Sequence, residues 1–587
     1  MKSIFNKRIE ELREKIKKAG LKGCLISICD PHMSETPSLH FASIFSYFCP
    51  FKGENADILI TLDKALLFVD GRFAFSSKKD VEGTVFEVID TTTSSLSIEE
   101  EIAKYDGYPL GIDYSLCSLD KANKLLSKGE IADFKLFDFF KNLVKLNDEP
   151  LFSLDKNATS LNSLEKINLV RGKMKENNLD AYVVSDLNEV AYLTNLRGFD
   201  LPYTPVFYGF LFIDLNNAYL FINKKRYKEQ IDGVDGIFSY DEFASFLKKC
   251  QNLRVGVDLN SINYELASIL KEKAVSLLSL VENEKAIKGP VEIDNIIKSQ
   301  IEDGVALTKF IINLKGEVKK GSDEYSLSKL LHSYREKGKH FLGESFENIV
   351  AVDANSACMH YAPNEKNYSR VDLNNSSLLI DSGGQYKYGT TDTTRTFVFK
   401  KPSEEFKKDY TLTLKSLIAL STAIFLDGAN GRSLDGIARS NMWKNLSDYK
   451  CGTGHGVSYL GPVHEGPNGF RYKDVYGKND GAKIVPGMIT TVEPGVYKEG
   501  KYGIRIENDL LCINYSENEF GKFYRFETIT YVPIETTSVD VTMLNEEEID
   551  FINRYHKTVF EKLSPYFDKE EILELKELTK PLVKNHI

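Results

Sequence analysis

Apolar and polar positions in the first part of the chain follow first a helical and then a strand-like period. A charged N-terminal segment carries apolar residues at helical spacing, and the short apolar runs after it have the length of buried strands. Helical segments then flank one further short strand, an order typical of an α/β domain. We expect strands at 23–29, 56–61, 64–70 and 110–113, with helices at 5–20, 97–106 and 118–128.

A similar order of helices and strands recurs in the next part of the chain. The ending Leu-Arg-Val-Gly-Val-Asp at 253–258 resembles Pro-Leu-Gly-Ile-Asp at 109–113. We therefore predict two copies of one architecture that share little sequence identity. In the second copy, helices are expected at 163–174 and 188–193, and strands at 181–185, 206–213, 218–222 and 253–258.

A third region begins with a predicted helix at 291–314 and runs to the end of the chain. It is richer in Gly, His, Thr and Asn, and several predicted strands are joined by glycine-containing turns. Linker-like residues near 157 and 288 mark the expected boundaries. Three regions fit a chain of 587 residues, which is too long for a single hydrophobic core.

Composition and charge narrow the class of protein. The chain is 42% hydrophobic and 27% charged, as folded soluble proteins are, and its net charge of −10 disfavours a nucleic-acid partner. No run of 18 apolar residues predicts a membrane span, and the N-terminus lacks the pattern of a signal peptide. The eight cysteines are dispersed without a Cys-x-x-Cys pair, which favours free thiols. We expect a cytoplasmic protein with no nucleic-acid or membrane partner.

Five segments of the third region each present a side chain that can bind a metal, next to glycine or other small residues. Asp381 ends an apolar strand, and Asp392 follows 11 residues later in a threonine-rich run on the adjacent strand of a hairpin. His455 lies between glycines, Glu493 precedes a Pro-Gly turn, and Glu507 lies in a predicted strand at 503–509. Taken singly, these residues have ordinary interpretations as a cap, a loop residue or a turn.

The combination of the five is less ordinary. Four carboxylates gathered in a core would repel one another, and burial would raise their pKa values. A bound cation removes that conflict, and oxygen-rich ligation with one histidine suits Mn²⁺, Co²⁺ or Zn²⁺. Carboxylates can also bridge two such ions, which together lower the pKa of a shared water.

The motifs around these residues resemble those of the pita-bread metallopeptidases, and within that family the long, three-domain X-prolyl aminopeptidases (aminopeptidases P). The resemblance covers essentially the whole chain, including its helical tail. The matching strings are Met-His-Tyr-Ala-Pro at 359–363, Asp-Ser-Gly-Gly-Gln-Tyr at 381–386, Gly-Thr-Thr-Asp-Thr-Thr-Arg at 389–395, Gly-Thr-Gly-His-Gly-Val at 452–457, Val-His-Glu-Gly-Pro at 463–467, Glu-Pro-Gly at 493–495 and, earlier, Asn-Leu-Arg-Gly at 195–198.

The resemblance implies a fold of mixed α/β and α+β class, in which two creatinase-N-like α/β domains precede a pita-bread catalytic domain. The implied domains are residues 1–157, 158–288 and 289–587, the last with a C-terminal helical extension. It also implies a homodimer. The implied activity is metal-dependent hydrolysis of the N-terminal X-Pro bond of oligopeptides, by a hydroxide that bridges two metal ions.

By the same resemblance, each member of the metal cluster has an expected role. Asp381 would chelate one ion, and His455 with Glu493 the other, while Asp392 and Glu507 would bridge both. The implied cofactor is a pair of divalent ions, Mn²⁺ first, with Zn²⁺ or Co²⁺ as alternatives. Glu493 would also take a proton from the hydroxide and pass it to the leaving amine.

Residues outside the ligand set also acquire expected roles. His360 and His464 would hold the substrate carbonyl and stabilise the tetrahedral intermediate, and Arg505 would orient the neighbouring carboxylates. Cys451 stands where many family members have a histidine that lines the substrate pocket, so we expect it to tune substrate binding. The segment 40–51 is an aromatic loop where the family has a glycine-rich stretch, and we expect it to be buried at an interface. The remaining histidines, His32, His40, His332, His340, His556 and His586, are expected at the surface or at caps.

Two other functions stay open at this point. An X-Pro dipeptidase (prolidase) would need a fixed cation to bind the free carboxylate of its substrate. A non-catalytic peptide- or protein-binding member of the fold is disfavoured, because such proteins lose metal ligands and all five are present here. Methionine aminopeptidase is disfavoured by the long region that precedes residue 289.

Overall fold

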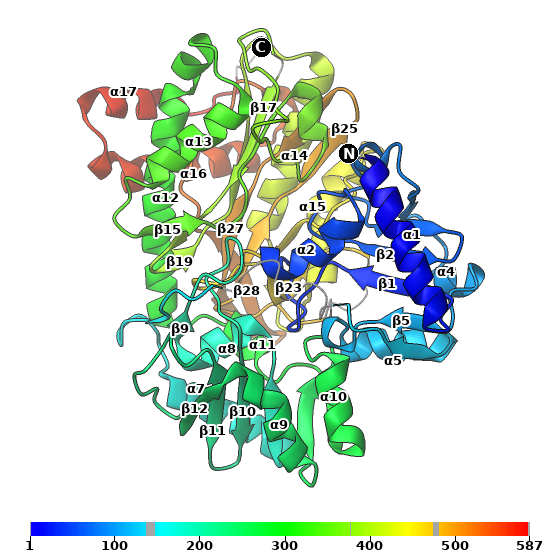
Figure 1. Cartoon of the computed structure of the whole chain (residues 1–587). Helices are drawn as coiled ribbons and strands as arrows, with labels where there is room; N and C mark the ends of the chain where they lie inside the picture. The colour runs from blue at the N-terminus through cyan, green and yellow to red at the C-terminus, as the bar shows by residue number, and fades with distance from the viewer. Residues whose placement is uncertain (1, 75, 137–146, 376, 474–480, 585–587) are drawn as a thin grey trace. The chain divides into compact units, whose positions relative to one another are not determined.

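A computed structural model describes residues 2–74, 76–136, 147–375, 377–473 and 481–584. The chain divides into two compact units. Unit 1 comprises Met1–Lys156 and Leu161–Glu282, and unit 2 comprises Asn157–Ser160 and Asn283–Ile587. In Figure 1, unit 1 runs from blue to green and unit 2, apart from its short segment Asn157–Ser160, from green to red.

The first half of unit 1 contains a six-stranded sheet in the order β4-β3-β2-β1-β5-β6. At its centre, β1 (Gly23–Ser27) pairs antiparallel with β2 (Asp57–Thr61) and parallel with β5 (Leu110–Ile112). The other elements are β3 (Ala65–Val69), β4 (Glu87–Asp90), β6 (Ile131–Asp133), α1 (Lys2–Lys18), α2 (Leu39–Phe48), α3 (Ser76–Val81), α4 (Ile98–Lys104) and α5 (Leu119–Lys128). The predicted helices and strands of this part are confirmed.

The second half of unit 1 repeats this topology in the order β12-β11-β10-β8-β13-β14. Here β8 (Ala181–Val184) is central, antiparallel to β10 (Gly209–Asp214) and parallel to β13 (Val255–Asp258). The pattern of parallel and antiparallel pairs matches that of the first sheet strand for strand, which confirms the predicted duplication. The other main elements are β11 (Ala218–Ile222), β12 (Gly236–Ser239), β14 (Ala274–Leu277), α7 (Ser163–Glu176), α8 (Leu187–Thr194), α9 (Phe243–Leu247) and α10 (Tyr264–Leu270).

The predicted aromatic loop at 40–51 is wrong, because most of this segment forms helix α2. Phe41, Ile44, Phe45 and Phe48 recur at helical spacing and are buried in the core of unit 1. A run this rich in aromatic residues has a strong apolar stripe, and burying that stripe favours a helix over a loop. Whether the segment takes part in an interface stays a prediction.

Three histidines expected at the surface or at caps are instead buried: His32, His40 and His556. The imidazole of His32 bonds to the Ser185 carbonyl through Nδ1 (2.6 Å) and to the Tyr240 hydroxyl through Nε2 (2.8 Å). Hydrogen bonds to both ring nitrogens allow a neutral histidine to be buried, which sequence alone does not reveal. His586 lies outside the described residues.

Unit 2 is built from antiparallel sheets flanked by helices. A three-stranded sheet, β16-β17-β20, and a six-stranded sheet, β21-β28-β27-β24-β22-β23, carry Asp381 and His455 in their strands and Asp392, Glu493 and Glu507 next to strand ends. Helices α14 and α15 pack against one another and against strands of the larger sheet, and their apolar faces form one core with α16. The strands are β16 (Ile349–Val352), β17 (Ser377–Ser382), β20 (Thr393–Val398), β21 (Ile424–Leu426), β22 (Gly454–Gly456), β23 (Glu465–Phe470), β24 (Ile489–Val492), β27 (Asn508–Asn518) and β28 (Gly521–Thr528).

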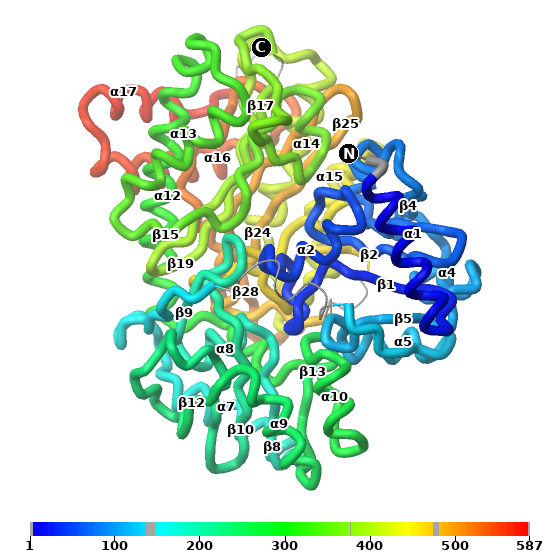
Figure 2. Tube along the Cα trace, viewed as in Figure 1, coloured from blue at the N-terminus to red at the C-terminus, as the bar shows by residue number. Residues whose placement is uncertain are grey.

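The helices of unit 2 include the predicted long one at its start and the predicted helical tail. Figure 2 shows α12 (Pro290–Lys319) running beside α13 (Glu324–Arg335), and these helices contact one another. The others are α11 (Glu282–Ala286), α14 (Glu404–Ser421), α15 (Gly431–Trp443), α16 (Glu546–Leu563) and α17 (Lys569–Leu578). No helix in the described ranges is both long and apolar enough to cross a membrane. The residue limits given above for the three domains stay a prediction.

Strand pairing in unit 2 places the predicted metal-binding side chains near strand ends. On the hairpin, Asp381 of β17 pairs with Thr394 of β20, as expected for adjacent strands. The predicted single strand at 503–509 is wrong: β26 (Tyr502–Arg505) pairs with β25 (Gly495–Lys498), and β27 begins at Asn508 in the larger sheet. Glu507 therefore lies where the chain passes from one sheet to another.

Helix α12 contains two glycines in opposite environments, which gives a test of its packing. A Cβ at Gly304 would lie 2.4 Å from the carbonyl oxygen of Tyr531, whereas at Gly316 no described atom outside its own helix lies within 4 Å. Gly304→Ala should therefore destabilise unit 2 by about 1–3 kcal/mol through overpacking against backbone. Gly316→Ala should stabilise it by up to about 1 kcal/mol, because alanine favours helix.

The measurement is urea unfolding followed by the fluorescence of Trp443, the only tryptophan of the chain, which lies in unit 2. Equal midpoints for the two variants would contradict the packing of α12 described here.

Candidate metal centre

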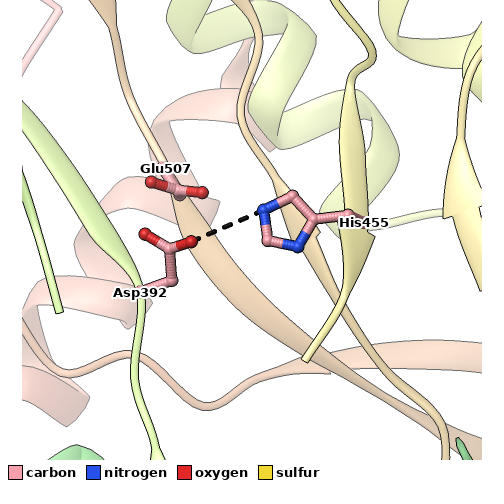
Figure 3. Close-up of side chains that lie close together, drawn as sticks. All are labelled: Asp392, His455 and Glu507. Carbon is pink, nitrogen blue, oxygen red and sulfur yellow. Dashed lines mark ion pairs between the residues drawn. The ribbon is translucent and has the colours of Figure 1, made fainter. Parts of the chain in front are cut away.

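Three predicted ligands converge from three different strands or strand ends (Figure 3). Asp392 directly precedes β20, His455 is the middle residue of β22, and Glu507 lies between β26 and β27. One ligand atom from each lies within 4.8 Å of the other two. Because the three side chains come from separate parts of the sequence, only the tertiary fold brings them together.

The orientation of His455 leaves one ring nitrogen available to a cation. Its Nδ1 lies 3.0 Å from the carbonyl oxygen of Gly456, and a carbonyl only accepts, so Nδ1 carries the proton. The lone pair is then on Nε2, which lies 3.5 Å from Asp392 Oδ2 and 3.6 Å from Glu493 Oε1. A backbone acceptor that fixes the tautomer in this way is typical of metal-binding histidines. The structure thus places Glu493, just after β24, beside the same nitrogen.

Asp381 is held by Arg505 through one oxygen only. The Nη2 of Arg505 donates to Asp381 Oδ2 at 2.5 Å. The other oxygen, Oδ1, is buried and has no hydrogen-bond partner among the described residues, and the same is true of Asp392 Oδ1. A buried carboxylate oxygen without a donor is energetically costly, so each of these atoms requires an explanation.

The pKa values of the cluster also indicate an excess of buried negative charge. Burial raises the pKa of Asp392 well above its usual range, and the negative charges of Asp381, Asp509 and Glu493 add to the effect. Burial likewise raises the pKa of Glu507, with further contributions from Asp392, Asp381 and Glu493. In the part of the chain that the structure describes, no lysine or arginine forms an ion pair with Asp392 or Glu507.

Elsewhere in unit 2 a buried carboxylate does have its cations. Glu465 is almost fully buried, and both Lys285, at 2.7 Å, and Lys288 form ion pairs with it. Burial alone would raise the pKa of Glu465, but the charges of the two lysines hold it below its usual range. The contrast with Asp392 and Glu507 shows that the fold can neutralise a buried acid and does not do so in the cluster.

The cluster fits divalent metal ions. It offers carboxylate oxygens that have no donor, one imidazole nitrogen with a free lone pair, and an excess of buried negative charge. Oxygen-rich ligation with one histidine suits Mn²⁺, and accepts Co²⁺ or Zn²⁺. The residues that could hold such ions are those predicted from the sequence.

Several residues that organise the cluster were not identified from the sequence. Thr394 Oγ1 donates to Glu507 Oε2 at 2.7 Å and accepts from Arg505 Nε at 3.1 Å. Buried Arg395 donates to the Glu507 carbonyl at 2.5 Å, and the Tyr497 hydroxyl accepts from Arg505 at 2.6 Å. The sequence shows a threonine and an arginine inside a buried strand, which indicates that they need polar partners. It does not show which ones, because the partners lie about a hundred residues away in sequence.

The other predicted site residues lie around this cluster. The His464 ring packs edge-on against that of His455, with centroids 4.3 Å apart. His360 follows Met359, whose carbonyl accepts from Arg505 at 3.4 Å. Burial, followed by the charge of Glu493, raises the pKa of the half-buried Cys451 thiol to about 12, so it is protonated at neutral pH. The roles of these residues in substrate binding stay predictions.

The sequence matches known protein families over most of its length. Residues 294–514 match the model of metallopeptidase family M24, residues 144–292 that of the creatinase/prolidase N-terminal domain, and residues 522–582 that of the C-terminal region of peptidase M24. Xaa-Pro aminopeptidase 1 of Dictyostelium discoideum is 32% identical over 99% of this chain and 97% of its own length. A probable Xaa-Pro aminopeptidase P of Talaromyces marneffei is 33% identical over 98% of this chain and 92% of its own length.

Solved structures show the same similarity. An X-prolyl aminopeptidase from Caenorhabditis elegans, described as a cytosolic enzyme with a di-nuclear active site, superposes with a TM-score of 0.91 at 29% identity. The match covers 99% of this chain and all of that one. An Xaa-Pro dipeptidase from Bacillus anthracis has a TM-score of 0.51 at 24% identity and covers 64% of this chain, so it is similar in fold alone.

The unbalanced charge of the cluster predicts how stability depends on pH when metal is absent. Asp392 and Glu507 have raised pKa values in the folded state, so their contribution is most favourable below their unfolded values of about 4 and is lost as the pH rises. The stability of metal-free protein relative to that of an Asp392→Asn variant should therefore fall from pH 4 to 7, and Mn²⁺ should restore stability. Asp392→Asn should stabilise the metal-free protein at pH 7 by about 1–3 kcal/mol and weaken the response to Mn²⁺.

Glu465→Gln is the matched control, because it removes a buried carboxylate that has its cations. It should destabilise unit 2 by about 3–5 kcal/mol, since two lysines lose their partner. Urea unfolding followed by Trp443 fluorescence measures both variants, and destabilisation by Asp392→Asn without metal would refute this electrostatic description.

Proposed function

Because the chain belongs to the Xaa-Pro aminopeptidases of metallopeptidase family M24, we propose that it releases the first residue of peptides whose second residue is proline, with two divalent metal ions as cofactor. The predicted fold class, two creatinase-like domains before a pita-bread catalytic domain, is confirmed. The observation that carries the proposal is the convergence of Asp392, His455 and Glu507 at a buried cluster, in which neither Asp392 nor Glu507 forms an ion pair with a lysine or arginine of the described residues.

We assign the ligands as follows. Asp381 would hold one ion and His455 with Glu493 the other, while Asp392 and Glu507 would serve both. The buried free oxygens of Asp381 and Asp392 support the assignment, as does the free Nε2 of His455. When bound, two such ions lower the pKa of a water toward neutrality and polarise a carbonyl. Mn²⁺ is the proposed native metal, because four carboxylates and one imidazole are hard ligands overall.

Glu493 and the residues around the ligands have separate proposed roles in the reaction. Glu493 takes a proton from the attacking water and transfers it to the amine that leaves. His360 and His464 donate hydrogen bonds to the scissile carbonyl as charge develops on its oxygen. Arg505 fixes Asp381 directly and Glu507 through the Thr394 hydroxyl, so that both carboxylates keep one orientation through the reaction. Cys451 lies near Glu493 as a neutral thiol and lines the substrate pocket.

Proline at the second position makes this bond chemically distinct. Its nitrogen carries no hydrogen, so an enzyme cannot anchor the bond through an amide N–H. The proline ring also fixes the φ angle of its residue, which limits the conformations of the substrate. A dedicated binding pocket is therefore favoured. An X-Pro dipeptidase is not favoured, because the similarity to Xaa-Pro aminopeptidases extends over nearly the whole chain whereas the dipeptidase match covers 64% of it.

We also propose that the enzyme is cytoplasmic and forms a homodimer. All eight cysteines are free, as in proteins of a reducing compartment. Unit 2 exposes large apolar side chains along β21 and the β27–β28 hairpin, among them Ile424, Leu426, Tyr515 and Phe520. A face of this kind is typical of a protein–protein interface.

The central test is peptide cleavage by metal-stripped protein with and without added Mn²⁺. Release of arginine from Arg-Pro-Pro should require metal and stop after the first residue, while Arg-Ala-Pro and an X-Pro dipeptide serve as comparison substrates. Asp392→Ala should reduce kcat/KM by about a thousand-fold or more, because a residue that serves both ions is lost. Mass spectrometry of the free amino acid measures each reaction.

Cleavage of the dipeptide alone would favour a prolidase. No cleavage with Mn²⁺, Zn²⁺ or Co²⁺ would overturn the proposed activity and favour a peptide-binding protein.

The homodimer has its own test. Light scattering coupled to size-exclusion chromatography should give twice the chain mass of 66.5 kDa. Phe520→Asp, on the exposed hairpin, should shift the protein toward the monomer because it places a charge on the apolar face. Lys522→Gln, on the same hairpin, changes the charge by the same one unit and is the control for a charge change alone. A monomer for the wild-type chain at micromolar concentration would contradict the proposal.

A further inference from the structure

One carboxylate outside the metal centre is buried and forms no ion pair with a described lysine or arginine, yet its oxygens have several hydrogen-bond donors. Glu324, the first residue of α13, has no exposed surface. Its oxygens accept hydrogen bonds from the backbone N–H of Val352 (2.7 Å) and Ser369 (2.6 Å), the amide of Asn355 (2.9 Å) and the hydroxyl of Tyr361 (2.7 Å). This many donors can stabilise a buried charge without a counterion.

All four donors belong to a single stretch of chain. They span residues 352–369, which leaves β16, forms a short 3-10 turn at Asp353–Ala357 and passes through His360. Glu324 accepts from its beginning, its middle and its end. Its central residues 358–364 lie outside regular strands and helices, so side-chain contacts such as these help to fix their backbone.

The same segment is fixed to the metal-binding side of unit 2. The Ser356 hydroxyl donates to the Gly503 carbonyl at 3.3 Å and accepts from the Gly503 N–H at 2.6 Å, and Gly503 lies on β26. The Met359 carbonyl accepts from the Arg505 guanidinium at 3.4 Å. The residue before His360 thus contacts Arg505, and the residue after it contacts Glu324.

Two separate contacts hold Tyr361, one made by its ring and one by its hydroxyl. Its ring packs against Ile349, Ala351 and Leu379, on the sheet that also carries Asp381. Its hydroxyl reaches Glu324, and burial together with that carboxylate raises the pKa of Tyr361, so the phenol stays protonated and donates. A phenylalanine at this position would keep the ring packing and lose only the hydrogen bond.

We propose that Glu324, acting through Tyr361, is a positioning residue that fixes the backbone at His360 for the reaction. The proposal rests on the proposed function, because it assigns His360 to the substrate carbonyl. Glu324 is not among the proposed metal ligands, and its side chain accepts hydrogen bonds from the segment 352–369. Its effect on catalysis passes through the placement of one imidazole, and a small displacement of a catalytic group is enough to slow a reaction strongly.

The test is a double-mutant cycle on kcat and KM with a proline-containing tripeptide. Tyr361→Phe should lower kcat/KM by roughly ten-fold, mainly through kcat, because a group that acts in the transition state is misplaced. In the His360→Ala background the same change should have less than about a two-fold effect, since the residue it positions is gone. Glu324→Gln should lower kcat/KM by about a hundred-fold.

Tyr325→Phe is the matched control. Tyr325 is the next residue of α13, and its hydroxyl donates at 3.3 Å to Glu365 in an exposed setting. This variant should keep wild-type kcat and KM. Equal losses from Tyr361→Phe with and without His360, or no loss at all, would show a merely structural contact and overturn the proposal.

Hydrogen exchange supplies a readout that does not depend on activity. Backbone amides in the peptide that covers 353–363 should exchange faster in Tyr361→Phe and at the wild-type rate in Tyr325→Phe. Unchanged exchange in Tyr361→Phe would overturn the positioning role, whatever the kinetics show. If the wild-type chain cleaves no X-Pro peptide, the proposed function fails separately, and exchange alone decides whether Glu324 fixes this segment.

Discussion

Uncompensated negative charge at the centre of unit 2 is the constraint on which the rest of the structure depends. Asp392 and Glu507 are buried next to Asp381 and Glu493, and a single arginine, Arg505, reaches this group through Asp381. Other buried carboxylates in the described part of the chain are compensated: Glu465 pairs with two lysines, Asp200 pairs with Arg226, and Glu324 accepts hydrogen bonds from four donors. A cluster of buried carboxylates with so little compensation is stable when a cation binds there.

The surrounding strands are arranged so that this cluster forms. The hairpin β17–β20 supplies Asp381 and Asp392, β22 supplies His455, and the passage from β26 to β27 supplies Glu507. Arg395 fixes that passage through the Glu507 carbonyl, and Thr394 fixes its side chain. Rigid support of this kind is what a hydrolytic centre needs, because the ligands must keep their geometry while charge moves. The same logic extends outward to Glu324, which holds the segment that carries His360.

Much of this could be predicted from the sequence, because the relevant signals are local. Apolar runs separated by turn residues predicted the paired strands, and the repeated order of elements predicted the duplicated architecture of unit 1. Glycines around His455 and threonines around Asp392 set these residues apart as candidate ligands. What could not be predicted depends on partners remote in sequence: the second hydrogen bond that lets His32 be buried, the threonine between Arg505 and Glu507, and the four donors gathered around Glu324. Helix α2 was missed for a different reason, since its aromatic run was interpreted by composition rather than by spacing.

The most direct test of the central claim is calorimetric titration of Mn²⁺ into metal-free protein, repeated in buffers of different ionisation enthalpy. The account predicts two ions bound per chain with net release of protons near neutral pH, because carboxyls whose pKa values are raised must give up protons to bind metal. Binding that does not saturate, or that saturates without proton release, would contradict a buried carboxylate cluster built for a pair of cations.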